Sequence, residues 1–314
     1  MSQLTPVSDI IEHAHEKKQA QQRRRFLLQL GVLATSACIP QTLVWAAETP
    51  KKGARRIVSI GGALTEIIYA LGGNNELVGV DTTSLYPDAA TKLPSVGYAR
   101  TLSSEGILAL APTHVLATED AGPPAVLRQI NSAGVPVTVL AANDKFEGVL
   151  DRVTRVGALI DRQSQAAQLA DKMKADWQRV HEPILARKSP GPRVLFVLSH
   201  SPNMIMVGGK GSSAEAMMGY AGAQNAVQGF NGFKPLTPEA VIAAQPDIVL
   251  FTDQGLGVVG GIDGALKLPG LAQTPAGQKR RIVSLEAMFM LGFGPRMPQA
   301  LAALDNVLLK AMNG

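Results

Sequence analysis

An internal repeat constrains the fold of this 314-residue chain more than any other feature of its sequence. Residues 102–119 (LSSEGILALAPTHVLATE) align without gaps on residues 236–253 (LTPEAVIAAQPDIVLFTD), at a constant offset of 134 positions. The positions that are identical in both copies are, numbered in the first, Leu102, Glu105, Ala109, Pro112, Val115, Leu116 and Thr118. A match of this length indicates two structurally related halves.

Each copy of the repeat describes the same structural unit. A Ser or Thr that can cap a short helix is followed two positions later by an acid, which suits the positive end of that helix. A Pro then ends the helix, and a β-branched run predicts a buried strand. Each half also begins with a short apolar strand, at 56–60 and 193–198, that leads through a Gly-containing turn into a helix. The pattern predicts an α/β fold with two lobes, each a parallel sheet covered by helices, and a ligand cleft between the lobes.

A long helix is expected to join the two lobes. Between residues 159 and 190, apolar side chains recur at spacings of three and four, which predicts one apolar helix face. We expect Pro183 to kink or end the helix, and the Pro-Gly-Pro run at 190–192 to stop it. The first lobe then covers residues 54–158 and the second residues 191–314. A periodic run of this kind predicts a stiff connection, because a flexible linker would be rich in Gly and Ser.

The first 46 residues have the pattern of an export signal. Arg23 and Arg24 precede Phe26, Leu27 and a weakly apolar stretch, which resembles the twin-arginine signal of bacteria. Small residues near its end predict cleavage after Ala46, followed by a linker at 47–53. We therefore expect an exported, periplasmic protein.

Two alternatives for the leader remain open, an N-terminal membrane anchor and a lipid anchor. Pro40 and Gln41 interrupt the apolar stretch and argue against a spanning helix. Cys38 follows Thr-Ser-Ala, which is a weak match to a lipoprotein box. Since Cys38 is the one cysteine of the chain, cleavage after Ala46 would leave no disulfide, no thiolate nucleophile and no cysteine zinc ligand.

The charge balance argues against a nucleic-acid partner. The chain has a net charge of +5, but residues 1–46 hold five of its 30 basic and three of its 25 acidic residues, so the remainder carries +3. No run of Lys and Arg remains there to follow a phosphate backbone.

Motifs of enzymes are scarce. Gly208–Ser213 lacks the spacing of a phosphate-binding loop and is better explained as a turn before a helix. The three histidines after the leader, His114, His181 and His200, are scattered, whereas a metal-dependent enzyme would need a cluster of His and carboxylates. We therefore expect no enzyme, and keep a periplasmic metal-dependent enzyme as the rival from another functional class.

The segment Ser95–Leu102 carries the chemistry that stands out. In an extended loop, Tyr98 and Arg100 would point the same way, because extended chain has a period of two. A nearby guanidinium favours phenolate over phenol, and tyrosinate is a known axial ligand of haem iron. On chemistry alone, a loop tyrosine beside a surface arginine is an equally good interpretation.

Four segments resemble the periplasmic haem-binding proteins of bacterial ABC haem importers. They are RIVSIGGALTE at 56–66, VGYARTLSSEG at 96–106, GAQNA at 222–226 and GFGPRMP at 292–298. The second and fourth segments are the specific ones. The first and third are shared with the wider group of helix-linked binding proteins, which includes vitamin B12 and siderophore binders, so these binders remain alternatives of the same fold.

The resemblance implies a ligand, a site and a partner. It implies that Tyr98 binds the iron of a transported haem b and that Arg100 supports the tyrosinate. Candidates in the second lobe are His200, Met204, Met206 and Arg296. It also implies delivery of haem to an inner-membrane permease dimer by a monomeric binder, with Glu66 and Glu215 docking on permease arginines. The plainer explanation of both acids is that they stabilise the first turn of a helix.

Overall fold

The computed structural model describes residues 53, 55–141, 143–201 and 204–314 of the chain, with the side chain of His200 left out. The predicted signal peptide, Cys38 and most of the predicted linker lie outside the described residues. Within the described part, no helix is both long and apolar enough to cross a membrane.

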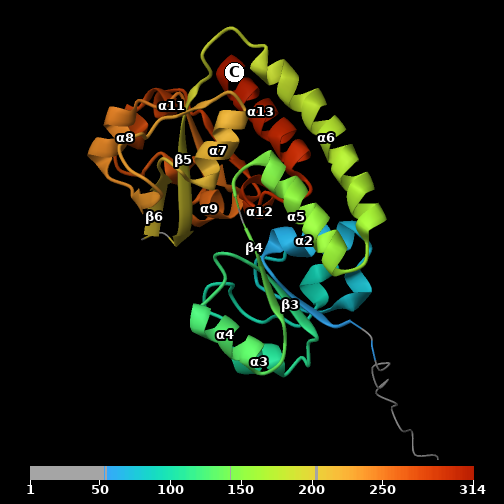
Figure 1. Ribbon diagram of the computed structural model, residues 1–314. Coiled ribbons are helices and arrows are strands. Elements are labelled where there is room, and N and C mark those ends of the chain that lie inside the picture. Colours follow the sequence, from blue (N-terminus) through green and yellow to red (C-terminus); the bar gives the residue numbers. More distant parts are fainter. Residues whose placement is uncertain (1–52, 54, 142, 202–203) are drawn as a thin grey trace, which may run out of the picture. The chain divides into compact units, whose positions relative to one another are not determined.

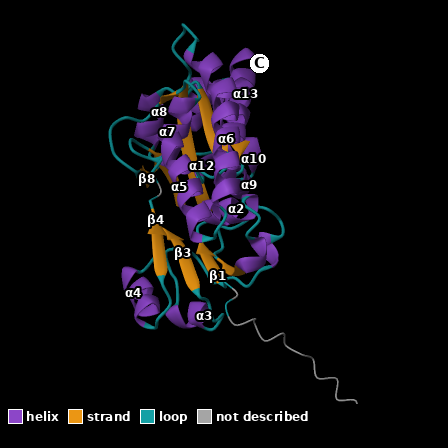
Figure 2. Ribbon diagram, turned by 45° about the vertical axis from the view of Figure 1, so that its right-hand side comes forward, coloured by secondary structure: helices purple, strands orange, loops and turns teal. Residues whose placement is uncertain are grey.

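The first sheet, sheet A, is entirely parallel. Its strands are β1 (Ile57–Ile60), β2 (Leu77–Val80), β3 (His114–Thr118) and β4 (Val137–Leu140), in the order β2-β1-β3-β4. The accompanying helices are α2 (Gly62–Ala70), α3 (Ser104–Leu108), α4 (Pro124–Ser132) and α5 (Phe146–Leu159), with 3-10 turns η1 (Asn74–Glu76) and η2 (Ala90–Lys92). Every residue of the central strand β1 is buried, as expected for a parallel strand covered on both faces. Figure 2 shows β1, β3 and β4 side by side.

The second sheet, sheet B, is mixed. Its main path runs β10-β9-β5-β6-β8, and β7 pairs with β5. The strands are β5 (Arg193–Ser201), β6 (Met204–Gly208), β7 (Gln224–Asn225), β8 (Phe233–Pro235), β9 (Ile248–Thr252) and β10 (Ile282–Leu285). Strands β10, β9, β5 and β7 are parallel, while β6 and β8 run antiparallel to their neighbours. The predicted α/β class is confirmed, but this sheet is not purely parallel, because β6 pairs antiparallel with both β5 and β8.

The helices of this second half fall between and after its strands. They are α7 (Ser213–Tyr220), α8 (Pro238–Ala244), α9 (Asp253–Val258), α10 (Gly261–Ala265), α11 (Pro275–Gln278), α12 (Ala287–Leu291) and α13 (Met297–Asn313), with the 3-10 turn η3 (Leu271–Gln273).

The internal repeat corresponds to equivalent elements of the two sheets. Strands β3 and β9 begin and end at positions 134 residues apart, and so do the first residues of α3 and α8. Both helices are capped as predicted: Ser103 Oγ accepts a hydrogen bond from Gly106 N (3.4 Å), and Thr237 Oγ1 from Ala240 N (3.3 Å). β3 pairs with β1 as β9 pairs with β5. The repeated unit is therefore a capped helix followed by a strand beside the first strand of its half.

Helix α6 (Gln163–Leu185) lies between the two sheets in the chain. It packs against α5 of the first half and α13 of the second, and Figure 1 shows it running alongside both. Its apolar face is held by Trp177, whose ring stacks on Phe146 (centroids 4.3 Å apart) and meets the edge of Tyr220 (4.9 Å). The predicted long helix is confirmed. The helix does not end at Pro183, because it continues to Leu185.

Two polar contacts join residues that lie far apart in the two halves. Arg296 donates through Nε and Nη2 to both carboxylate oxygens of Glu66, at 2.8 and 2.6 Å. Arg152 donates through Nη2 to the carbonyl of Phe293 (2.6 Å). Gly294 lets the two segments approach, because a Cβ at this position would lie 3.2 Å from Glu66 Oε2. Together these contacts fix the segment before α13 against α2 and α5.

These linking charges are strongly desolvated. Glu66 is 5% exposed and Arg152 is 2% exposed. Burial raises the pKa of Glu66, and the hydrogen bonds from Arg296 offset part of that rise. Burial lowers the pKa of Arg152, and the negative charges of Asp144 and Glu119 offset part of this fall. Each buried charge therefore depends on its partner, and losing one partner leaves the other unpaired.

We expect the pair Glu66–Arg296 to show strong energetic coupling. Arg296→Gln alone should lower the free energy of unfolding by about 3 kcal/mol, because it leaves the buried Glu66 without its counter-ion. Glu66→Gln should cost less, because Arg296 is more exposed and keeps Glu286 at 4.0 Å. The double variant should lose far less than the sum. Chemical denaturation of the four proteins gives the coupling energy.

The matched control is the exposed pair Asp263–Arg280 (2.6 Å) in the same half. Asp263→Asn should leave stability unchanged, since solvent screens such pairs. Additive losses at Glu66 and Arg296 would contradict the coupling.

Candidate functional site

The loop after β2 is held rigidly at the carboxyl end of sheet A. Asp81, 2% exposed, accepts hydrogen bonds from Gly61 N (2.9 Å) and from Thr83 Oγ1 (2.6 Å). These bonds tie the loop to the turn that begins α2. The loop then presents Leu85 and Tyr86, which are 54% and 47% exposed. Two large apolar side chains are thus displayed at the edge where parallel sheets bind ligands.

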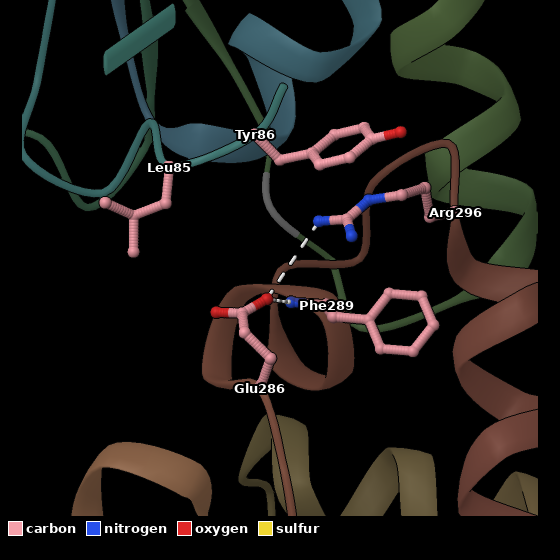
Figure 3. A pocket seen from close by; sticks show the side chains of 5 residues that line it. All are labelled: Leu85, Tyr86, Glu286, Phe289 and Arg296. Carbon is pink, nitrogen blue, oxygen red and sulfur yellow. Dashed lines mark hydrogen bonds and ion pairs between the residues drawn. The ribbon is translucent and has the colours of Figure 1, made fainter. Parts of the chain in front are cut away.

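A pocket of about 260 Å³ lies between this loop and the second half of the chain. It is lined by Leu85 and Tyr86 on one side and by Glu286, Phe289 and Arg296 on the other (Figure 3). Glu286 caps α12, accepting from Met288 N and Phe289 N. The cap fixes both the carboxylate and the first turn that carries the Phe289 ring.

Arg296 lies between the aromatic walls of this pocket. Its guanidinium carbon is 3.8 Å from the centroid of Tyr86 and 4.9 Å from that of Phe289, which is cation–π distance (Figure 3). Its Nη2 is 4.0 Å from Glu286 Oε2, in addition to the two bonds with Glu66. Burial alone would lower the pKa of Arg296, but the hydrogen bonds and charge of Glu66 outweigh it and raise that pKa. The same ion pair that links the halves thus also shapes the pocket.

Tyr98 lies in a loop next to the one that carries Tyr86. Its side chain is 43% exposed. The preceding Gly97 has φ +88°, a conformation that favours glycine, and its carbonyl accepts from Thr82 N (3.0 Å). The loops of Tyr86 and Tyr98 are therefore hydrogen-bonded to each other at the same end of β2. Tyr98 is free to meet a ligand, although it does not line the pocket around Arg296.

The prediction of an extended Tyr98–Arg100 segment is wrong. Thr101 N donates to Tyr98 O (2.9 Å), which closes a turn, and Ala99 O accepts from Gly122 N (2.8 Å) in the loop after β3. Arg100 reaches Asp120, with Nη2 2.9 Å from Oδ2. Asp120 raises the pKa of Arg100 against the effect of burial, and the neighbouring phenol of Tyr98 adds to this rise. Arg100 is thus close to Tyr98 but forms an ion pair with the carboxylate of Asp120.

The other residues predicted for the second lobe are spread over the β5–β6 hairpin. His200 belongs to β5, but its side chain is not described. Met204 begins β6 and is 57% exposed, while Met206 on the same strand is half-buried. Neither methionine lines the pocket around Arg296, whereas Arg296 itself does.

The acids predicted to dock on a permease have different surroundings. Glu66 is buried against Arg296, so docking through it would require this ion pair to break. Glu215 is half-buried and accepts from Gly211 N (2.7 Å), as expected for an acid that stabilises the start of a helix. Their docking role stays a prediction. The equivalent acids of the repeat, Glu105 and Glu239, are both exposed.

Four pocket residues were missed in the sequence, Leu85, Tyr86, Glu286 and Phe289. Tyr86 stands before Pro87, a context that is typical of a turn rather than of a binding site. Glu286 and Phe289 lie shortly before the segment at 292–298, which is one of the two segments that specifically resemble haem-binding proteins. That proximity was the one signal that could have extended the site to α12.

The chain is similar to proteins that carry ligands to membrane transporters. The family model for periplasmic binding proteins matches residues 57–288. An uncharacterized ABC transporter substrate-binding lipoprotein of Bacillus subtilis is 29% identical over 82% of this chain and 80% of its own length. The vitamin B12-binding protein of Yersinia pestis is 28% identical over 45% of this chain and about half, 51%, of its own length.

Among solved structures, the periplasmic heme-binding protein BhuT in complex with two hemes superimposes with a TM-score of 0.80. It is 47% identical, and the match covers 83% of this chain and all of BhuT. The fold, with a parallel and a mixed sheet joined by one long helix, agrees with these matches. The chain belongs to the periplasmic binding protein family.

Proposed function

We propose that this protein binds haem in the periplasm, as a monomer, and delivers it to an ABC importer of the inner membrane. One observation carries the proposal. Tyr98 is an exposed tyrosine beside Arg100, at the carboxyl end of sheet A, in a chain that is 47% identical to a heme-binding protein. The protein acts on this account as a carrier and not as an enzyme.

The proposed chemistry needs few groups. Tyrosinate is a hard anionic ligand that suits ferric haem iron. Arg100 places a positive charge beside the proposed ligand oxygen, although Asp120 neutralises part of that charge. Apolar side chains at the same end of the sheet, Leu85 and Tyr86, offer surface against which a porphyrin can pack.

A cobalamin or siderophore binder of the same fold is the alternative. The vitamin B12-binding relative supports it, but that match covers less than half of this chain. A siderophore site would present several Trp, Tyr and Arg side chains, whereas Trp177, the one Trp after residue 46, is buried against Phe146. Haem therefore agrees better than cobalamin or a siderophore with the residues of the site and with the heme-binding relative BhuT, which is 47% identical to this chain.

We expect Tyr98→Phe to remove the ferric high-spin charge-transfer band of bound hemin at the red end of the visible spectrum. The ring stays while the iron ligand is lost, so binding should weaken as well. Arg100→Ala should do less, since it removes support for the tyrosinate but not the iron bond. For Arg100→Ala we expect a loss of about tenfold in affinity, or about 1.4 kcal/mol.

Absorbance titration of the purified variants with hemin tests this. Tyr69→Phe, on α2 and half-buried, is the matched control and should keep the band. An unchanged spectrum in Tyr98→Phe would place the iron ligand elsewhere, and His200 would be the next residue to replace.

We further place docking to the permease on Glu105 and Glu239. They occupy the same position of the repeat, each in the first turn of a capped helix, and both are exposed. A docking surface needs charges that a partner can reach, which favours them over the buried Glu66.

Charge reversal distinguishes the two pairs of acids. Glu105→Arg with Glu239→Arg should abolish haem uptake by cells while leaving the hemin spectrum unchanged. Glu215→Arg should keep uptake. The opposite result, in which Glu215→Arg loses uptake and the double variant keeps it, would favour docking through Glu66 and Glu215 instead.

Export is proposed to use the twin-arginine route. Replacing Arg23 and Arg24 by Lys should leave precursor in the cytoplasm, because the receptor of this route reads the guanidinium pair. Fractionation followed by immunoblotting measures it. Mature protein in the periplasm of a Sec-competent strain would mean that another route is used.

A further inference from the structure

The pocket around Arg296 has room for part of a large ligand. Its volume of about 260 Å³ is below the range of roughly 300–1,000 Å³ that encloses a whole small molecule. Its walls come from both halves of the chain, with Leu85 and Tyr86 from the first half and Glu286, Phe289 and Arg296 from the second (Figure 3). A ligand held between the halves could insert one edge here.

The charges of the pocket do not suit an anion. Among the residues that line it, the guanidinium of Arg296 is the one positive group. Glu66 already holds it through two hydrogen bonds of 2.6 and 2.8 Å, and the carboxylate of Glu286 lies 4.0 Å away. A propionate would be the third carboxylate around a single guanidinium. Like charges at this distance repel, and desolvating another anion adds to that cost.

The apolar walls suit an uncharged edge. Leu85 and Tyr86 are about half exposed, so covering them removes apolar surface from water. The rings of Tyr86 and Phe289 are held in place by the cation between them, at 3.8 and 4.9 Å. The guanidinium occupies the space between the two rings, so a planar, apolar group can pack on Leu85 and on the ring edges without any of the ion pairs having to break.

We infer that the pocket of Leu85, Tyr86 and Phe289 receives the vinyl-bearing apolar edge of the bound porphyrin, so that the propionates point away from it. The inference rests on the proposed haem function and adds an orientation and two specificity-determining residues, Tyr86 and Phe289. Arg296 and Glu66 are positioning residues here: they hold the aromatic walls and leave no free positive charge for a propionate.

Matched ligands test this orientation. Deuterohemin has hydrogens in place of both vinyl groups and keeps the propionates, so it probes the apolar edge alone. The protein should bind hemin about tenfold more tightly than deuterohemin, from the apolar surface of the vinyl groups. In Phe289→Ala and Tyr86→Ala this ratio should fall to below about threefold.

Phe230→Ala is the control, because Phe230 also carries a cation on its ring, with Lys234 Nζ 5.1 Å from the centroid, but lies outside the pocket. It should keep the full ratio. Phe289→Leu, which retains more apolar volume, should give an intermediate ratio and serves if Phe289→Ala fails to fold.

The opposite orientation makes a distinct prediction. If a propionate entered the pocket, Glu286→Gln would tighten hemin binding but not the binding of hemin dimethyl ester, and this result would overturn the inference. A hemin-to-deuterohemin ratio that is the same in the unaltered protein and in Phe289→Ala would overturn it too. Both outcomes can be distinguished from failure of the proposed function, because in that case the unaltered protein would show no tyrosinate band with hemin. The expected result is a band that persists in every pocket variant, with the ratio lost in Tyr86→Ala and Phe289→Ala.

Discussion

The ion pair between Glu66 and Arg296 links the two halves of the described chain. It joins side chains 230 positions apart, one from the first helix of the first half and one from the start of the last helix. Because Glu66 is 5% exposed, its charge needs this partner in the folded state. The pair fixes the segment before α13 against α2, where the Arg152–Phe293 bond holds it from a second side.

The geometry of the candidate site follows from this constraint. The guanidinium of Arg296 is held by Glu66 and in turn holds the rings of Tyr86 and Phe289, so a structural ion pair also sets the walls of the pocket. The loop of Tyr86 is hydrogen-bonded to the loop of Tyr98 through Thr82 N and Gly97 O. The Glu66–Arg296 ion pair is thus connected to the proposed iron ligand, Tyr98, through the loop of Tyr86 and its hydrogen bond to the loop of Tyr98. If haem is the ligand as proposed, substitutions at residues that do not bind iron are expected to change its orientation.

The sequence predicted what depends on local pattern. The repeat located β3 and β9 and the caps at Ser103 and Thr237, because capping and strand burial are encoded within a few residues. The periodic run located α6. The antiparallel strands β6 and β8 and the turn at Tyr98 were missed although they are partly local, and the pairing of Glu66 with Arg296 was missed because it depends on tertiary contact. Glu66 is the clearest case, since an early acid in a helix looks the same whether it faces solvent or an arginine from the other half. Only the fold brings Arg296 to it.

The proposed ligand is haem, bound through tyrosinate at the end of sheet A. Titration of the purified, unmodified protein with hemin and, separately, with cyanocobalamin tests this proposal. We expect a saturable hemin spectrum of the ferric high-spin tyrosinate type and no binding of cyanocobalamin by calorimetry. Saturable binding of cyanocobalamin together with a hemin spectrum no different from that of free hemin would contradict it.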